Sequence, residues 1–131
     1  MLVEKLQADF PQFNFKCGTR FSFRFPKTIQ YPAELSNYFD LELLHELGHA
    51  TLGHRYFPTD IKRLKMESDA WEQARFYARQ YKVEIDEDFI ESELDTYRDW
   101  LHTKSKCKKC GLTRFQTPDG AYHCPHCDIK Q

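Results

Sequence analysis

The residues with the clearest chemical potential are His45, Glu46 and His49, in the segment His45-Glu46-Leu47-Gly48-His49. Side chains four residues apart on an α-helix lie one above the other, so both imidazoles can bind a single metal ion. Glu46 then lies beside the metal rather than on it. So short a pattern also occurs by chance on helices of unrelated proteins, but the apolar turn before it and Gly48 within it favour a packed, zinc-binding helix.

A zinc ion bound by two histidines needs a third protein ligand, and a catalytic site keeps a fourth position open for water. We expect Glu67 as this ligand. It follows His49 by 18 residues, near the start of a second helix that can turn back and pack antiparallel against the first. Asp69 and Glu72, further along the same helix, are the acidic alternatives.

His54 is a further candidate for the third ligand, because Gly53 could break the helix and turn His54 back toward the metal. The spacing does not match the pattern H-x-x-G-x-x-H, through which some zinc peptidases add a third histidine. On a continuing helix, His54 would also point away from the face of His45 and His49. We therefore expect His54 to cap or pack rather than to bind.

The chemistry that these residues predict is hydrolysis of a peptide bond. Zinc lowers the pKa of a bound water toward roughly 7, so Glu46 can take its proton during attack on a carbonyl and pass it to the leaving amine. A donor for the developing oxyanion is also needed, and Tyr97, His102 and Tyr77 are the candidates on the second and third helices. The alternative is a non-catalytic zinc-binding module with a regulatory role.

A second group of metal ligands lies near the C-terminus, where two C-x-x-C pairs are separated by 13 residues. Four thiolates at this spacing close a tetrahedral zinc site with no open position. The residues between the pairs predict two strands, joined at Pro118-Asp119-Gly120. We expect residues 104–131 to form a zinc ribbon that depends on its metal for folding, with Cys107, Cys110, Cys124 and Cys127 as ligands.

The expected ribbon is basic, and it is a candidate surface for a protein or nucleic-acid partner. His123 and His126 could replace a thiolate, although the four cysteines already complete the site. Cys17 is outside both groups and is expected to be a buried or unpaired strand residue. The side chains available for phosphate contacts are Lys104, Lys106, Lys108, Lys109 and Arg114.

The sequence pattern around these groups predicts an α+β fold. We expect a short antiparallel sheet packed on the active-site helix and two further helices. Alternation of aromatic and polar residues over 13–25 predicts a hairpin, and the prolines around 27–31 predict an edge strand. Apolar periodicity predicts three helices and then a linker. The expected bounds are 36–56, 65–81 and 86–102 for the helices, 103–106 for the linker, and 1–103 for the metallopeptidase-like domain.

Composition is that of a folded protein, with 131 residues, 40% hydrophobic residues and a net charge of -1. This charge gives no global attraction to nucleic acid or to an anionic membrane. The first residues contain no apolar run of signal-peptide length, and no run is long enough to span a membrane. We expect a cytoplasmic protein without a membrane partner, whose paired cysteines bind metal rather than form disulfides.

The segment from His45 to His54, together with Met66-Glu67-Ser-Asp69-Ala-Trp-Glu-Gln-Ala, resembles the small gluzincin-like peptidases of the ImmA/IrrE type. In that family, a helix that opens with Glu-x-Glu-Ala supplies the third zinc ligand, and Glu67-Ser-Asp69-Ala matches it position by position. The resemblance covers about residues 20 to 80. It implies a minigluzincin-like fold, a polypeptide substrate, and a substrate cleft bordered by residues 28–31.

The chain departs from this family in three ways. Trp71 stands where Asp or Asn is usual, and Gln73 where Phe is usual, so the usual partner of a zinc-binding histidine is missing at these positions. Asp69 and Glu72 are the alternatives for this role. Members often act on a transcriptional repressor and carry a helix-turn-helix domain. None is visible here, so repressor cleavage does not carry over.

Overall fold

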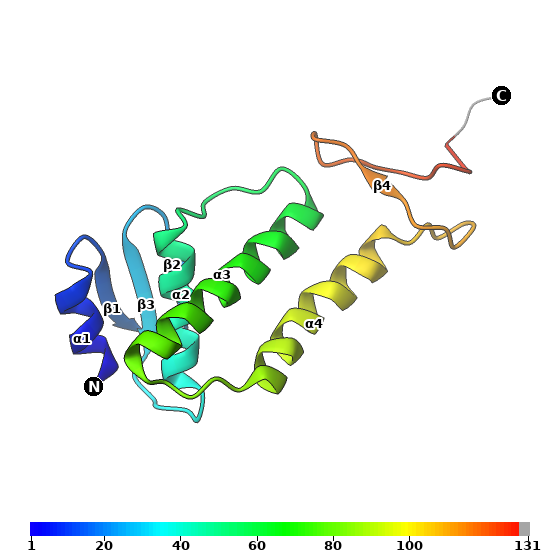
Figure 1. The fold of residues 1–131 in the computed structure, drawn as a ribbon. Helices are drawn as coiled ribbons and strands as arrows, with labels where there is room; N and C mark the ends of the chain where they lie inside the picture. Colours follow the sequence, from blue (N-terminus) through cyan, green and yellow to red (C-terminus); the bar gives the residue numbers. More distant parts are fainter. Residues whose placement is uncertain (129–131) are drawn as a thin grey trace. The chain divides into compact units, whose positions relative to one another are not determined.

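The computed structural model describes residues 1–128, which form an α+β fold with four helices and two small sheets (Figure 1). The chain forms two compact units. The first combines Met1–Arg55 with Met66–Asp86, and the second combines Tyr56–Lys65 with Glu87–Gln131. The expected division at residue 103 therefore differs from these units, because the helix before the cysteines belongs with them.

The first unit contains a three-stranded sheet in the order β1-β3-β2, formed by β1 (Asn14–Gly18), β2 (Ser22–Arg24) and β3 (Thr28–Pro32). Strand β1 pairs with β3 in parallel, and β2 pairs with β3 antiparallel. The sheet is therefore mixed, and the prediction of an antiparallel sheet was wrong. So was the predicted hairpin, because β1 and β2 each pair with β3 and not with one another.

Strand β3 is the central strand, and its prediction as an edge strand was also wrong. Pro26 precedes the strand and Pro32 is its last residue, so neither proline interrupts the ladder between them. Ile29, at the middle of β3, is completely buried. Because both sides of β3 are paired from Thr28 to Gln30, these residues cannot offer a free backbone edge to a substrate.

Two helices of the first unit, α1 (Leu2–Asp9) and α2 (Phe39–Thr51), contact this sheet (Figure 1). Helix α1, which the sequence did not predict, buries Leu2 and Leu6 and contacts β1. Helix α2 packs against β2 and β3. It ends seven residues before Pro58, shorter than expected, because Gly53 adopts a positive φ of 69° that terminates it.

Helix α3 (Asp60–Tyr81) follows the connection after α2, and its residues are divided between the two units. From Met66 onward it belongs to the first unit, where Ala70, Ala74 and Ala78 are completely buried. These small side chains allow another backbone to approach closely. The predicted second helix is therefore confirmed, with a start five residues earlier.

The second unit contains α4 (Glu87–Ser105) and a two-stranded antiparallel sheet of β4 (Phe115–Gln116) and β5 (Tyr122–His123). Helix α4 begins directly after Asp86, as expected, but it continues through most of the predicted linker. The two short strands confirm the predicted hairpin. Within residues 1–128, no helix combines the length and the apolar character needed to cross a lipid bilayer.

Candidate metal centres

His45, His49 and Glu67 converge at one point of the first unit. The carboxylate atom Oε2 of Glu67 lies 3.0 Å from Nε2 of His45 and 2.8 Å from Nε2 of His49. One ligand atom from each residue lies within 4.8 Å of the others. The third ligand expected from the sequence is thus the one that the fold brings to the histidines, and this group could hold a metal ion.

The distances from Glu67 to the two imidazole nitrogens suit an ion of the size of zinc. Nitrogen and oxygen ligands around a tetrahedral zinc lie about 2.0–2.2 Å from the metal, and therefore about 3.3 Å from one another. The separations of 2.8 and 3.0 Å need only a small side-chain adjustment to reach this value. Three protein ligands would also leave a fourth tetrahedral position open.

Gly48 is the reason that α2 and α3 approach closely enough for this contact. A Cβ atom at position 48 would lie 2.6 Å from the backbone oxygen of Ala70, closer than such atoms ever approach. Position 48 faces α3 from between the two histidines, and Ala70 lies one turn after Glu67. The prediction that Gly48 permits close backbone packing is therefore confirmed.

Electrostatics in the group favour an ionised Glu67. Burial alone would raise its pKa, but the hydrogen bonds and charges of His45 and His49 hold that pKa well below its usual range. Burial lowers the pKa of His45. Burial acts in the same direction on His49, yet the hydrogen bond and the charge of Glu67 outweigh it and raise the pKa of His49. The group thus combines an anionic carboxylate with two imidazoles, a suitable donor set for a divalent cation.

Glu46 is buried beside these ligands without being one of them. Its carboxylate Oε1 lies 3.7 Å from Nδ1 of His45, too far for a hydrogen bond. Burial raises the pKa of Glu46 to about 7, with nearby Glu67 and Glu42 acting in the same direction and His49 against it. A carboxylate with such a pKa can accept and release a proton near neutral pH.

Trp71 contacts the site in a way that the sequence did not predict. Its indole stacks on the ring of His45, with ring centres 4.1 Å apart and planes only 9° from parallel. The indole is almost completely buried, so it fixes the plane of His45 by packing. Trp71 thus supports one of the candidate ligands.

His54 does not join the converging donor atoms, but it contacts one of the ligands. Its Nδ1 lies 2.8 Å from Nδ1 of His49, on the side of that ring opposite Glu67. The expectation that His54 points away was wrong, because it assumed a continuing helix. Burial, followed by the proximity of His49, lowers the pKa of His54. The neutral ring can share a hydrogen bond with His49.

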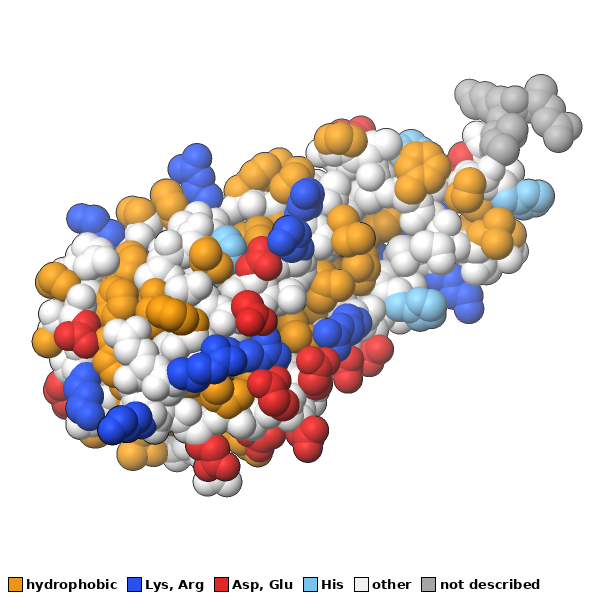
Figure 2. Space-filling view, viewed as in Figure 1, with side chains coloured by type: hydrophobic (Ala, Val, Ile, Leu, Met, Phe, Trp, Pro, Cys, Tyr) orange, Lys and Arg blue, Asp and Glu red, His pale blue; other side chains and the backbone are white. Residues whose placement is uncertain are grey.

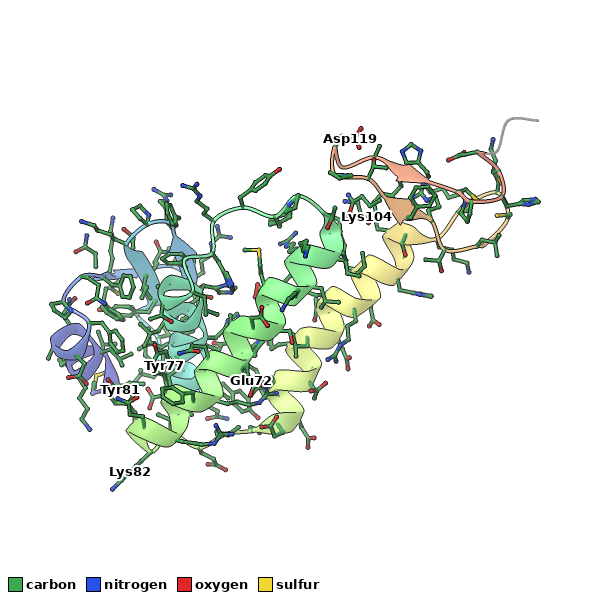
Figure 3. All side chains as sticks on the ribbon, turned by 45° about the horizontal axis from the view of Figure 1, so that its top comes forward. Glu72, Tyr77, Tyr81, Lys82, Lys104 and Asp119 are labelled. Atoms are coloured by element: carbon green, nitrogen blue, oxygen red, sulfur yellow. The ribbon has the colours of Figure 1, made fainter. Side chains whose placement is uncertain are left out.

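The acidic alternatives on α3 lie outside the converging group. Glu72 has a side chain that is 73% exposed and forms an ion pair with Arg75 at 2.9 Å (Figure 3). Asp69 is partly buried, and its charge acts on His54 rather than on the two histidine ligands. Neither carboxylate replaces Glu67 in this structure.

The three expected oxyanion donors have different surroundings. Tyr77 is buried, and its ring packs against Phe10 and Phe76 with ring centres 5.5 and 5.6 Å away, so it is a core residue of the first unit. Tyr97 and His102 are on α4, in the second unit. The ring of Tyr97 contacts the guanidinium of Arg63, and His102 is exposed. A donor role for these two stays a prediction.

The four cysteines of the second unit form the other candidate metal centre. The sulfur atoms of Cys107 and Cys127 are 3.9 Å apart, and those of Cys110 and Cys124 are 3.5 Å apart. Thiolates bound tetrahedrally to zinc at about 2.3 Å lie about 3.8 Å from one another, so the cluster has the dimensions of such a site. Cys17 lies elsewhere, on β1, and is exposed rather than buried.

Backbone amides favour a thiolate at one of the cysteines, Cys107, whereas the hydrogen bond with Cys110, followed by burial, raises the pKa of the Cys127 thiol to about 12. The N–H groups of His126 and Cys127 approach the sulfur of Cys124, at 3.4 and 3.3 Å. Hydrogen bonds from the amides of Cys110 and Lys109 lower the pKa of the Cys107 thiol to about 6. A thiolate is the form that binds metal.

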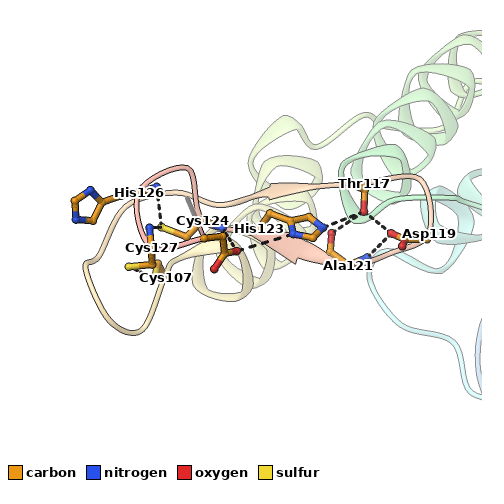
Figure 4. A network of polar contacts seen from close by, with 9 residues as sticks. Cys107, Thr117, Asp119, Ala121, His123, Cys124, His126 and Cys127 are labelled. Atoms are coloured by element: carbon orange, nitrogen blue, oxygen red, sulfur yellow. Dashed lines mark hydrogen bonds and ion pairs between the residues drawn. The ribbon is translucent and has the colours of Figure 1, made fainter. Parts of the chain in front are cut away.

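The hairpin next to the cysteines is held by its own polar network (Figure 4). Thr117 accepts or donates hydrogen bonds with Asp119, the backbone of Ala121 and the ring of His123. Asp128 accepts a hydrogen bond from the backbone N–H of Cys124 at 2.7 Å. His123 therefore belongs to the hairpin rather than to the metal ligands.

A buried carboxylate also ties the hairpin to the first turn of α3, within the same unit. Asp60 accepts hydrogen bonds from the hydroxyl of Tyr122 at 2.6 Å and from Lys104 at 2.9 Å. Its backbone N–H donates to the side chain of Gln116 at 2.6 Å. Burial would raise the pKa of Asp60, but these donors together lower it.

Two of the five cations expected to contact phosphates have structural partners instead. Lys104 pairs with Asp60, and Arg114 donates to the backbone oxygen of Lys104 while lying over the ring of Tyr122. The other three, Lys106, Lys108 and Lys109, are exposed. On the face drawn in Figure 2, several acidic side chains gather along the lower edge, and basic side chains lie beside and above them.

Comparisons with known proteins identified no similar protein. No family model matches the chain, and neither a curated protein nor a solved structure shows significant similarity to it.

Proposed function

We propose that this chain is a zinc-dependent peptidase. The observation that carries the proposal is the convergence of His45, His49 and Glu67, with the buried carboxylate of Glu46 next to them. Three ligands of this kind, with an open position, are typical of catalytic rather than structural zinc sites. The four-cysteine cluster has no open position, and its proposed role is to fold the ribbon.

A zinc ion at the three ligands would activate a water molecule and polarise the carbonyl of the peptide bond. Glu46 takes a proton from that water while the new carbon–oxygen bond forms. It then delivers the proton to the nitrogen as the carbon–nitrogen bond breaks, so that the products are a carboxylate and an amine. Glu67 provides the negatively charged third ligand. Trp71 holds the ring of His45 in place.

Hydrolysis by the zinc-loaded full chain tests this proposal, with unfolded casein and a mixture of fluorescence-quenched peptides as probes. We expect cleavage that falls roughly 100- to 10,000-fold in Glu46→Gln, while the metal content stays the same. Asp40→Asn, an exposed substitution on the same helix, is the matched control and should retain activity. Absence of cleavage by the parent chain, or full activity in Glu46→Gln, would overturn the proposal.

A further inference from the structure

The end of α2 is built so that His54 returns to the ring of His49. The N–H of Gly53 donates to the oxygen of Ala50 at 3.1 Å, and the N–H of His54 donates to the oxygen of His49 at 3.0 Å. With the positive φ of Gly53, these two bonds make a Schellman motif, which commonly includes a side-chain contact between the same two positions. Here that contact, often apolar, is a hydrogen bond between two imidazoles.

The position of the proton in this hydrogen bond follows from geometry. The two Nδ1 atoms are 2.8 Å apart, so one ring donates and the other accepts. His49 directs its other nitrogen, Nε2, at Glu67 and at the ligand group. A nitrogen that binds metal offers a lone pair, so in the metal-bound form the proton of His49 is on Nδ1. His49 is then the donor, and His54 accepts.

We infer that His54 is a positioning residue that fixes the tautomer and the ring plane of His49 for metal binding. This inference rests on the proposed metal site. Metal-binding histidines commonly donate their second N–H to a carboxylate or carbonyl, and loss of such a partner weakens metal binding roughly 10- to 100-fold. In this structure His54 is positioned to accept the second N–H of His49. The other ligand, His45, is held by a different device, the stacked ring of Trp71.

The two ligands therefore depend on different neighbours, which allows the inference to be separated from general damage to the fold. Removal of the His54 ring deletes the acceptor, whereas asparagine at position 54 places an amide oxygen near the position of the lost Nδ1. Arg55 is the adjacent exposed residue, and Arg55→Leu tests whether any change in this loop has the same effect.

The experiment is a zinc titration of the full chain, followed by the ¹⁵N NMR signals of the histidine rings, which report this site separately from the cysteines. We expect His54→Leu to bind zinc at His49 roughly 10- to 100-fold more weakly and to lose the slowly exchanging Nδ1 proton of His49. His54→Asn should recover most of the affinity, and Arg55→Leu should match the parent.

Unchanged affinity in His54→Leu, or no recovery in His54→Asn, would overturn the inference. A zinc-induced shift at a nitrogen of His54 itself would also overturn it, because His54 would then be a ligand. If the parent chain binds no zinc at His45 and His49, the proposed function fails instead.

Discussion

The two candidate metal centres are assembled in opposite ways. His45 and His49 come from one helix and Glu67 from another, so this centre exists only if α2 and α3 pack correctly. The four cysteines lie within a short stretch of chain, in turns next to a small hairpin. The first centre therefore forms only when the surrounding helices have folded, whereas metal binding at the second centre should drive the folding of the ribbon. This difference predicts different responses to mutation.

The largest effect is expected from loss of a thiolate. Cys107→Ala should abolish metal binding in the ribbon and unfold residues near the cysteines, because so small a module has little apolar core of its own. Apparent binding free energies of structural zinc are roughly 10–16 kcal/mol, far more than the hairpin can replace. Two-dimensional NMR should show collapse of the signals of β4 and β5, with those of α2 retained.

Cys17→Ala is the matched control, since this cysteine is exposed and lies outside the cluster. It should leave the metal content and the NMR signals of the ribbon unchanged. A ribbon that keeps dispersed signals in Cys107→Ala, or after metal removal, would show that the metal does not drive its folding.

A smaller effect is expected from substitution of Gly48, on which the close packing of α2 and α3 at the first centre depends. In Gly48→Val the new side chain would meet the backbone oxygen of Ala70, which cannot rotate away. We expect the free energy of unfolding to fall by about 3 kcal/mol, with weaker metal binding at His45 and His49 and an intact cysteine centre. Denaturant unfolding and metal titration check this, with the exposed change Asp40→Ala on the same helix as the control. Full zinc affinity in Gly48→Val would contradict the dependence on close packing.

These contrasts also explain what could be predicted from the sequence. The pairs His45/His49 and Cys107/Cys110 are set by local spacing, so their roles follow from helix and turn geometry alone. Glu67 could be predicted because only a short connection follows the first helix, so a residue in the first half of the second helix can reach back to His45 and His49. Whether Glu67 actually meets His45 and His49 depends on Gly48, whose small size was a visible signal.

The errors arose where pairing or packing between distant segments decides the outcome. Alternation over residues 13–25 indicated strands correctly, but it does not say which strand each one pairs with, and β3 separates β1 from β2. The supporting roles of Trp71 and His54 were missed for the same reason. Gly53 was the available signal for His54, because a glycine shortly after an apolar helix predicts a turn of positive φ.

The smallest effect is expected at Asp60, which joins the hairpin to the start of α3. Asp60→Asn should lower the free energy of unfolding at pH 7 by about 2 kcal/mol, because it removes a buried charge-assisted hydrogen bond. The folded protein lowers the pKa of Asp60, so its contribution is present above the unfolded value of about 3.9 and is lost as the pH falls through the lower folded value.

Urea unfolding of the parent and Asp60→Asn between pH 7 and pH 3 measures this contribution. The difference between the two should shrink as the solution becomes acidic. Asp99→Asn, an exposed change on α4 in the same unit, serves as the control for general charge effects. A difference that stays constant, or grows, toward low pH would contradict the assignment.

The central claim is that His45, His49 and Glu67 form one metal centre, separate from the cysteines. Elemental analysis of the folded parent chain and of Glu67→Ala tests it most directly, with Glu72→Ala, an exposed change on the same helix, as the control. We predict two zinc ions per chain for the parent and for Glu72→Ala, one per candidate centre, and one for Glu67→Ala. Two zinc ions retained in Glu67→Ala would contradict the claim.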